Sequence, residues 1–224
     1  MNWLSSNFPY VGELTVLHLL QSIIPVIFGT IVAIPIARFA MGRRRDGRST
    51  ERTTGAGKLR RGFVIHSAAL LYTIPSLALF VLMPLVLGTS ITSLVNVFVA
   101  LTLYVIAMMV RSAVDAFDSV SPVTLESATA IDYRPVRRFW AVELPLAVPV
   151  LIAGLRVALV SNISMVSVGA VIGIQSLGTL FTDGLRRDLP AEIITGIVAT
   201  VILALVLDRL LALLGAFLTR WRAA

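Results

Sequence analysis

The chain has 224 residues, of which 57% are hydrophobic and only 14% are charged, and it carries a net charge of +7. Soluble domains contain about 25% charged residues, so this composition excludes an ordinary soluble domain and indicates a membrane protein with several spans. The chain contains no cysteine, which excludes disulfides and thiolate-bound metals.

Several apolar segments are long enough to cross a bilayer, which takes about 20 residues each. They predict an all-α fold in which a single transmembrane domain, residues 1–224, forms a polytopic bundle of about five helices. The stretch before the first span, MNWLSSNFPYVGEL, has no basic region, so we expect no cleavable signal peptide. The predicted spans are residues 14–40, 63–87, 91–110, 146–172 and 191–217.

The basic residues predict the orientation of these spans, because cytoplasmic loops of membrane proteins are enriched in Arg and Lys. Sixteen of the nineteen basic residues fall on one side if the segment 42–61, GRRRDGRSTERTTGAGKLRR, is placed in the cytoplasm. The N-terminus is then outside and the C-terminus inside. The same segment could bind acidic lipid headgroups, or it could serve only as a topology determinant and a mobile, solvated linker.

The first three spans contain few polar side chains. His18 and Gln21 lie near the outer part of the first span, where we expect them to form hydrogen bonds within the bundle. In the second span, the sequence Thr73-Ile74-Pro75-Ser76 predicts a kink, because proline frees a backbone carbonyl. The candidate residues for a translocation path in the second and third spans are Thr73, Pro75, Ser76, Asn96 and Tyr104.

The segment between the third and fourth spans, residues 111–145, is charged and longer than most connections in compact bundles. Ser121-Pro122 predicts a helix start, with Ser as the N-cap and Pro at the first helical position. Pro135 interrupts that helix, and Asp132 tolerates a bend better than most residues. Two short helices, closed by Leu144-Pro145, would form an elbow that docks a cytoplasmic partner.

The fourth span contains Arg156 near its middle, where an arginine costs about 2.5 to 3.5 kcal/mol on insertion scales. This side chain should therefore face protein or water, either at a pore or gate or in a hydrogen bond to a neighbouring helix. The run SNISMVS, residues 161–167, spaces its serines by single turns, so it could line the path or hold helices together. The candidate path residues in this span are Arg156, Ser161, Asn162, Ser164 and Ser167.

The elbow resembles the cytoplasmic signature of ABC importer permeases, which reads E-A-A, three residues, G, nine residues, I, one residue and L-P. This chain has Glu126-Ser127-Ala128, Asp132, Val142 and Leu144-Pro145 at that spacing. Two positions depart from the signature, because Ser127 replaces an alanine and Asp132 replaces the glycine. An Asp at the bend could change the angle of the elbow or the strength of docking.

Three further stretches narrow the resemblance: YTIPSLALFVLMPLVLG, VELPLAVPVLIAGLRVA and SLGTLFTDGL. They look like the permeases of osmoprotectant importers, which carry glycine betaine, choline or carnitine, and the similarity covers residues 14–214. The chain departs from these permeases in its longer basic segment, in Gln175 where they often have glycine, and in RSAVDAF after the third span.

The resemblance implies a type I ABC importer permease fold in a bacterial inner or plasma membrane. A short coupling helix would seat on a cytoplasmic ATPase subunit, and a second permease subunit and an extracytoplasmic binding protein would complete the transporter. The chain has no Gly-x4-Gly-Lys-Ser/Thr loop, so ATP and Mg²⁺ would bind the ATPase and we expect no cofactor here. The implied docking residues are Glu126, Ser127, Ala128, Ile131, Asp132, Leu144 and Pro145.

Three alternatives remain open at this point. The nearest is an ABC importer permease for an amino acid such as methionine. A proton-coupled secondary transporter is disfavoured because Glu13, Glu192 and Asp208 lie towards span ends and no carboxylate is central. An enzyme is disfavoured because the sequence has no His/Glu metal constellation and no nucleophile–base grouping. We therefore expect no catalytic residue, no metal site and no nucleic-acid partner.

Overall fold

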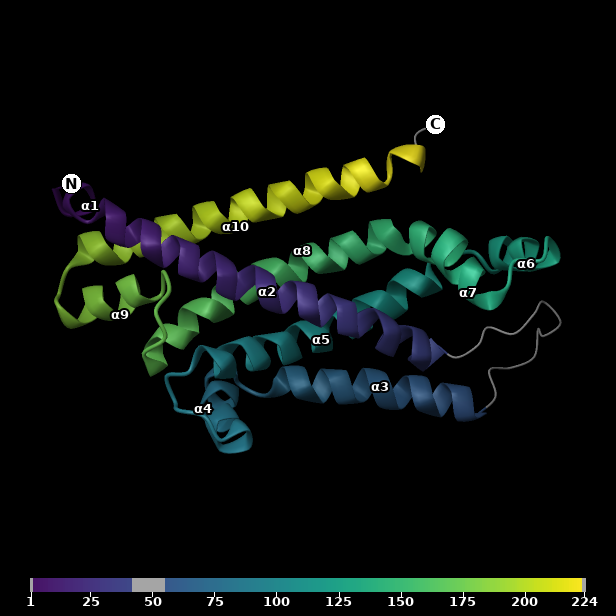
Figure 1. The fold of residues 1–224 in the computed structure, drawn as a ribbon, viewed down its shortest axis with the longest axis horizontal. Helices are drawn as coiled ribbons and strands as arrows, with labels where there is room; N and C mark the ends of the chain where they lie inside the picture. The colour runs from purple at the N-terminus through teal and green to yellow at the C-terminus, as the bar shows by residue number, and fades with distance from the viewer. Residues whose placement is uncertain (1, 42–54, 223–224) are drawn as a thin grey trace.

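The structure, a computed structural model, describes residues 2–41 and 55–222, and every regular element in these two ranges is helical. Residues 42–54, which make up most of the predicted basic segment, lie outside the described residues. Figure 1 shows the long helices running side by side, with α6 and α7 at one end of the molecule and α1 and α9 at the other. The elements are α1 (Asn2–Ser6), α2 (Phe8–Met41), α3 (Gly55–Thr73), α4 (Ser76–Leu87), α5 (Leu94–Asp118), α6 (Pro122–Ala130), α7 (Pro135–Arg138), the π-helical turn η1 (Phe139–Glu143), α8 (Leu144–Val168), the 3-10 turn η2 (Gly169–Ile172), α9 (Thr179–Arg186), α10 (Pro190–Leu218) and the 3-10 turn η3 (Arg220–Arg222).

The core of the bundle is formed by α2, α5 and α8. Their contact surfaces are built from small and β-branched side chains, such as the fully buried Ala33, Ala113 and Ala147. Small residues allow the backbones of membrane helices to approach closely. At Gly29 of α2, an added Cβ would lie 2.5 Å from Cγ1 of Val105 on α5, so only glycine fits there.

The structure has four or five candidate spans, compared with about five predicted. Three single helices, α2, α5 and α10, and the continuous helical stretch Pro135–Ile172 are long and apolar enough to cross a membrane. The pair of helices α3 and α4 makes a fifth candidate if it counts as one span. The helix α2 begins before the predicted residue 14, and α5 continues past the predicted residue 110, because Ala113 and Phe117 are still buried in the core.

The predicted second span, residues 63–87, is not one continuous helix in the structure. It is divided into α3 and α4, which are bent by 100° relative to each other. Pro75 stands at the break, where the kink was predicted, but the bend is close to a right angle and not a small tilt within one span. The 12 residues of α4 form a helix about 18 Å long, which is too short for a hydrocarbon layer of about 30 Å.

The start of α3 corrects a second expectation. Residues 55–61 were expected in a mobile linker, but they form the first turns of this helix. Arg61 forms an ion pair with Asp118 at the end of α5. The guanidinium of Arg60 lies 5.0 Å from the centre of the Phe39 ring on α2. These contacts order a segment that its composition alone assigns to solvent.

Candidate functional site

The elbow starts where the sequence predicts it. The helix α6 begins at Pro122, directly after Ser121, whose extended backbone (ψ 128°) places it at the N-cap position. The Ser121 side chain forms no capping hydrogen bond within the described residues, which differs from the expectation. The start of α6 therefore depends on the fixed φ of proline and not on a serine cap.

The bend after α6 is a Schellman motif. The amide of Tyr133 donates to the carbonyl of Ala128 (3.1 Å), and the amide of Asp132 donates to that of Thr129 (3.0 Å). Asp132 adopts a φ of 63°, in the left-handed region that is strained for most residues. This conformation explains why the signature has glycine at the position, since this motif usually ends a helix on glycine.

The two faces of α6 differ in burial. Ala128 is only 6% exposed and packs with Leu125 toward the rest of the protein. Glu126 and Ser127 are exposed, and Ile131 at the end of the helix is 71% exposed. The elbow therefore presents a carboxylate, a hydroxyl and a large apolar side chain on a surface that no described part of the chain covers. Such a surface suits a protein partner.

One polar contact closes the elbow on itself and another attaches it to the bundle, and sequence reasoning missed both. Nη1 of the buried Arg138 donates to Oγ1 of Thr129, which joins α7 to α6. Glu143 in η1 is 1% exposed, and its carboxylate lies 3.5 Å from Nη2 of Arg38 near the end of α2. A carboxylate directly before an apolar span is a signal that could have indicated such a pair. Leu144 and Pro145, predicted docking residues, are half-buried at the start of α8.

The turn η1 between the elbow and α8 has π-helical geometry. Single π-helical turns in helices frequently occur at functional sites. Here the turn places Glu143 against Arg38 of α2, directly before the start of α8.

Asn162 takes part in contacts between core helices. Its Nδ2 donates to the carbonyl of Ser22 on α2 (2.8 Å), and Nε2 of His18 lies 3.1 Å from the carbonyl of Ile163. Nε2 of Gln21 donates to a loop carbonyl 2.8 Å away. All three side chains are buried, so the structure gives them packing contacts between α2 and the rest of the bundle.

The three serines of the fourth span do not share one surface. Ser164 is exposed, and its Oγ lies 3.4 Å from the carbonyl of Val160. Ser161 is half-buried. Ser167 lies under the loop that follows η2, because a Cβ added to Gly178 would be 2.3 Å from the Ser167 carbonyl oxygen. Only Ser164 of this set therefore faces outward from the described chain.

Arg156 of α8 forms a bidentate ion pair with Asp208 of α10. Nε and Nη2 of Arg156 each lie 2.7 Å from one oxygen of the Asp208 carboxylate. The side chains are 40% and 21% exposed, respectively. The sequence places Asp208 toward a span end and shows no partner for it. The structure brings it to the level of Arg156, so the arginine charge is compensated within the chain.

The candidates around the second span gather at the break between α3 and α4. The Tyr104 hydroxyl donates to the carbonyl of Ile74, next to Pro75. The Asn96 side chain is fully buried and binds the loop before α5, donating to the carbonyl of Ser90 (2.7 Å). Thr73 is exposed, and its hydroxyl donates to Leu70 within α3 (2.7 Å). Ser76, at the start of α4, is half-buried. Tyr104 thus contacts the break itself, whereas Asn96 binds the loop between α4 and α5.

The described part of the chain contains no group of three or more His, Asp or Glu side chains positioned to hold a metal ion. The features that it does contain are a protruding helical elbow, polar contacts from that elbow to the core helices, and a broken helix pair.

The chain belongs to the family of binding-protein-dependent transport system inner membrane components, whose sequence model matches residues 54–222. It is therefore a multi-span, inner-membrane permease component, and the ATPase of such a transporter is a separate subunit.

Two curated relatives are similar over nearly their whole length. The osmoprotectant import permease protein OsmW of Salmonella typhimurium is 33% identical over 98% of this chain and 96% of its own. The glycine betaine/carnitine/choline transport system permease protein OpuCB of Bacillus subtilis is 31% identical over 95% of this chain and 90% of its own.

The fold is similar to a solved ABC importer. A chain of the MetNI methionine ABC transporter in an inward-facing conformation superposes with a TM-score of 0.76, covering 94% of each chain. Its sequence identity is 20%, so this similarity establishes the fold alone. It confirms the ABC importer permease architecture expected from the elbow signature.

Proposed function

We propose that this chain is the permease subunit of an ATP-driven importer of osmoprotectants such as glycine betaine, choline or carnitine. The observation that carries the proposal is the 33% identity to an osmoprotectant import permease over nearly the full length of both chains. An importer of an amino acid such as methionine is the second candidate, but only a fold similarity at 20% identity supports it.

The elbow would dock the ATPase subunit. Glu126, Ser127 and Ile131 face away from the bundle and would enter a groove on that subunit, whereas the buried Ala128 supports the helix from behind. The ion pair between Glu143 and its arginine partner on α2 would then carry the movement of the ATPase into the core.

The proposed orientation places this end of the molecule in the cytoplasm. It contains the exposed Arg134 and Arg137 of the elbow and the basic first turns of α3. Arginine and lysine concentrate on the cytoplasmic side of membrane proteins, which supports an outer N-terminus and an inner C-terminus.

The substrate path would lie between this chain and a second permease subunit. The exposed stripe of α8 and η2 formed by Val157, Val160, Ser164 and Val171 supports this arrangement, because it is apolar except for one hydroxyl. The ion pair with Asp208 compensates the charge of Arg156, so this arginine need not repel a quaternary ammonium group. Further candidates for the path are the exposed Thr73 and Pro75 and the half-buried Ser76 and Ser161. The path would be supported from within the chain by Asn96, Tyr104, Asn162 and Ser167.

Uptake of radiolabelled glycine betaine, choline and carnitine would test the proposed function. Cells would express the chain together with its ATPase, second permease and binding protein, with or without an inactivating substitution in the ATPase. We expect uptake of at least one compound that disappears when the ATPase is inactive. Uptake that survives inactivation would contradict ATP-driven transport, and uptake of methionine alone would favour the second candidate.

A Glu126→Arg variant tests the docking surface separately. Reversing this exposed charge should leave insertion unchanged but weaken binding of the ATPase subunit about tenfold or more. The attraction between the Glu126 carboxylate and a basic group of that subunit becomes a repulsion between like charges. Copurification of the ATPase with the permease measures this binding, and Glu126→Gln should have a smaller effect. Full binding to the Glu126→Arg variant would exclude this residue from the interface.

A further inference from the structure

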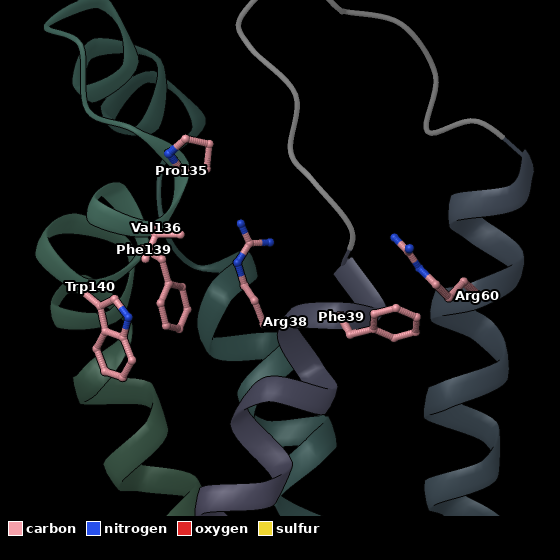
Figure 2. Close-up of a pocket in the computed structure, with 7 residues that line it drawn as sticks. All are labelled: Arg38, Phe39, Arg60, Pro135, Val136, Phe139 and Trp140. Atoms are coloured by element: carbon pink, nitrogen blue, oxygen red, sulfur yellow. The ribbon is translucent and has the colours of Figure 1, made fainter.

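An open cavity of about 490 Å³ lies beside the elbow. Its walls come from segments that are far apart in the sequence: the end of α2, the first turns of α3, α7 and η1. Figure 2 shows the side chains of Arg38 and Arg60 directed to the same open end of the cavity, with aromatic rings on both sides. The lining residues are Arg38, Phe39, Arg60, Pro135, Val136, Phe139 and Trp140.

The cavity is positively charged. The guanidinium of Arg60 lies over the Phe39 ring, and its buried Nε donates to no atom of the described residues. Arg38 lies 5.7 Å from the centre of the Phe139 ring and 3.5 Å from the carboxylate of Glu143. That carboxylate is 1% exposed and does not line the cavity. Two guanidiniums thus face a cavity in which no described lining residue is acidic, which favours an anion.

The position of the cavity favours a lipid as the source of that anion. Phe39 and Trp140 are 65% and 64% exposed, and they stand where α2 and η1 pass into apolar spans. Aromatic residues concentrate at the boundary between membrane and water. Basic pockets between membrane helices on the cytoplasmic side bind anionic lipid headgroups. If the phosphate of a phospholipid lay near the guanidiniums, the acyl chains of that lipid would run along the exposed aromatic and aliphatic side chains.

We propose that this cavity binds the phosphate of an anionic phospholipid headgroup. The lipid would contact α2 and α3 on one side and the elbow on the other. It would thus add a second connection between α2 and the elbow, beside the ion pair of Arg38 with Glu143. The proposal concerns a site away from the substrate path, and it holds whatever substrate the transporter carries. An acidic segment of the ATPase subunit is the competing occupant, but it would not use the exposed aromatic side chains that continue toward the spans.

Trp140 provides a direct probe of this site, because it lines the cavity and the chain has only two other tryptophans. The full-length chain with Trp3→Phe and Trp221→Phe would be reconstituted in lipid vesicles. In one set of vesicles, phosphatidylglycerol brominated in its acyl chains would be a minor component in unlabelled phosphatidylcholine. In the reference set, the same fraction of brominated phosphatidylcholine would be mixed with unlabelled phosphatidylglycerol. We expect the brominated phosphatidylglycerol to quench Trp140 more strongly than the same fraction of brominated phosphatidylcholine.

An Arg60→Gln variant should lose this preference about tenfold, because it removes a charged donor to the phosphate, whereas Lys58→Gln should lose less. The matched control is Lys58→Gln, which removes a charge two residues earlier on α3, outside the lining. Arg60→Lys keeps the charge and should retain most of the preference, which separates loss of binding from loss of folding.

Three results would overturn the proposal. Equal quenching by the two brominated lipids in the unsubstituted cavity would show that it has no preference for an anionic lipid. An equal loss in the Arg60→Gln and Lys58→Gln variants would show a general effect of surface charge. Release of the quenching by an added ATPase subunit would show that the cavity belongs to a protein interface.

Discussion

Asp132 is the residue on which the shape of the elbow depends. Its φ of 63° reverses the chain after α6 and allows the Tyr133 amide to reach the Ala128 carbonyl. Glycine adopts this conformation without strain, and Asp adopts it more readily than most other residues. The replacement of the signature glycine is therefore compatible with the same bend.

We expect Asp132→Gly to preserve the elbow and Asp132→Val to open it. A β-branched side chain at positive φ is strained by about 1 to 2 kcal/mol. The amides of Asp132 and Tyr133 should then exchange their hydrogens about tenfold faster in the valine variant, which mass spectrometry of the purified complex can measure. Equal exchange in the two variants would mean that the backbone conformation at this position is not what closes α6.

At the scale of elements, close approach between α5 and α8 depends on a glycine. A Cβ added to Gly154 would lie 2.5 Å from Cβ and 2.6 Å from Oγ of Ser112, so the helices meet without a side chain on α8. A Cβ added to Gly12 on α2 would have no atom within 4 Å, so this glycine is a matched control in another span.

Gly154→Ala should destabilise the protein by about 1 to 3 kcal/mol, because the added methyl forces two core helices apart. The midpoint of unfolding in a denaturing detergent measures the effect, and Gly12→Ala should leave it unchanged. Adding Ser112→Gly removes both clashing atoms, so the double variant should recover most of the lost stability. No recovery would indicate that the cost arises elsewhere than at this contact.

The broken helix pair is a second feature at the scale of elements. The hydroxyl of Tyr104 on α5 satisfies the Ile74 carbonyl at the break. The Tyr72 ring packs edge-on against Tyr104, with ring centres 6.0 Å apart, and Tyr72 itself is 44% exposed. The position of α4 thus depends on a hydrogen bond from a different helix.

Tyr104→Phe should cost about 1 to 3 kcal/mol, because it leaves a backbone carbonyl without a partner in an apolar region. The same unfolding experiment measures this cost, and a cross-linking or spin-label distance between α4 and α5 would report whether the break shifts. Tyr72→Phe is the control, since it removes a hydroxyl nearby without touching the carbonyl. A cost of equal size in both variants would argue against the hydrogen bond.

At the scale of the whole molecule, α10 lies along the outside of the bundle, next to α8 (Figure 1). One face of α10, with Val201, Leu205 and Leu213, is exposed in the single chain, whereas Leu203 and Leu207 are buried against the bundle. The pair between Arg156 and Asp208 is the strong polar contact between these two spans. A single unpaired charge at this depth would be costly, whereas two uncharged residues in place of Arg156 and Asp208 would not be.

Arg156→Leu alone should therefore reduce the amount of folded protein in the membrane several-fold, since it leaves the Asp208 carboxylate unpaired. The double variant with Asp208→Leu should restore that amount, and so should the exchanged pair Arg156→Asp with Asp208→Arg. Membrane expression level and protease resistance measure folding, and substrate uptake measures function. A double variant that folds no better than Arg156→Leu would contradict the pairing.

The sequence by itself determined the class of this protein. Apolar length predicted the spans, and Ser121-Pro122, Asp132 and Pro135 predicted an elbow, because proline and a left-handed residue act through their own backbone geometry. The spacing from Glu126 to Pro145 predicted the permease family, which the comparisons confirm. These features are local, so neighbouring residues along the chain are enough to establish them.

Only the tertiary structure decided which distant residues meet. The partners of Arg156 and Glu143, the 100° bend at Pro75 and the ordered turns of α3 depend on contacts between helices. Periodicity shows that a helix has faces, but it does not show which face of another helix lies opposite. The lipid-facing and helix-facing sides of a membrane helix are both mostly apolar, so hydropathy does not distinguish a lipid contact from a helix contact. The packing of α2, α5, α8 and α10 makes that distinction.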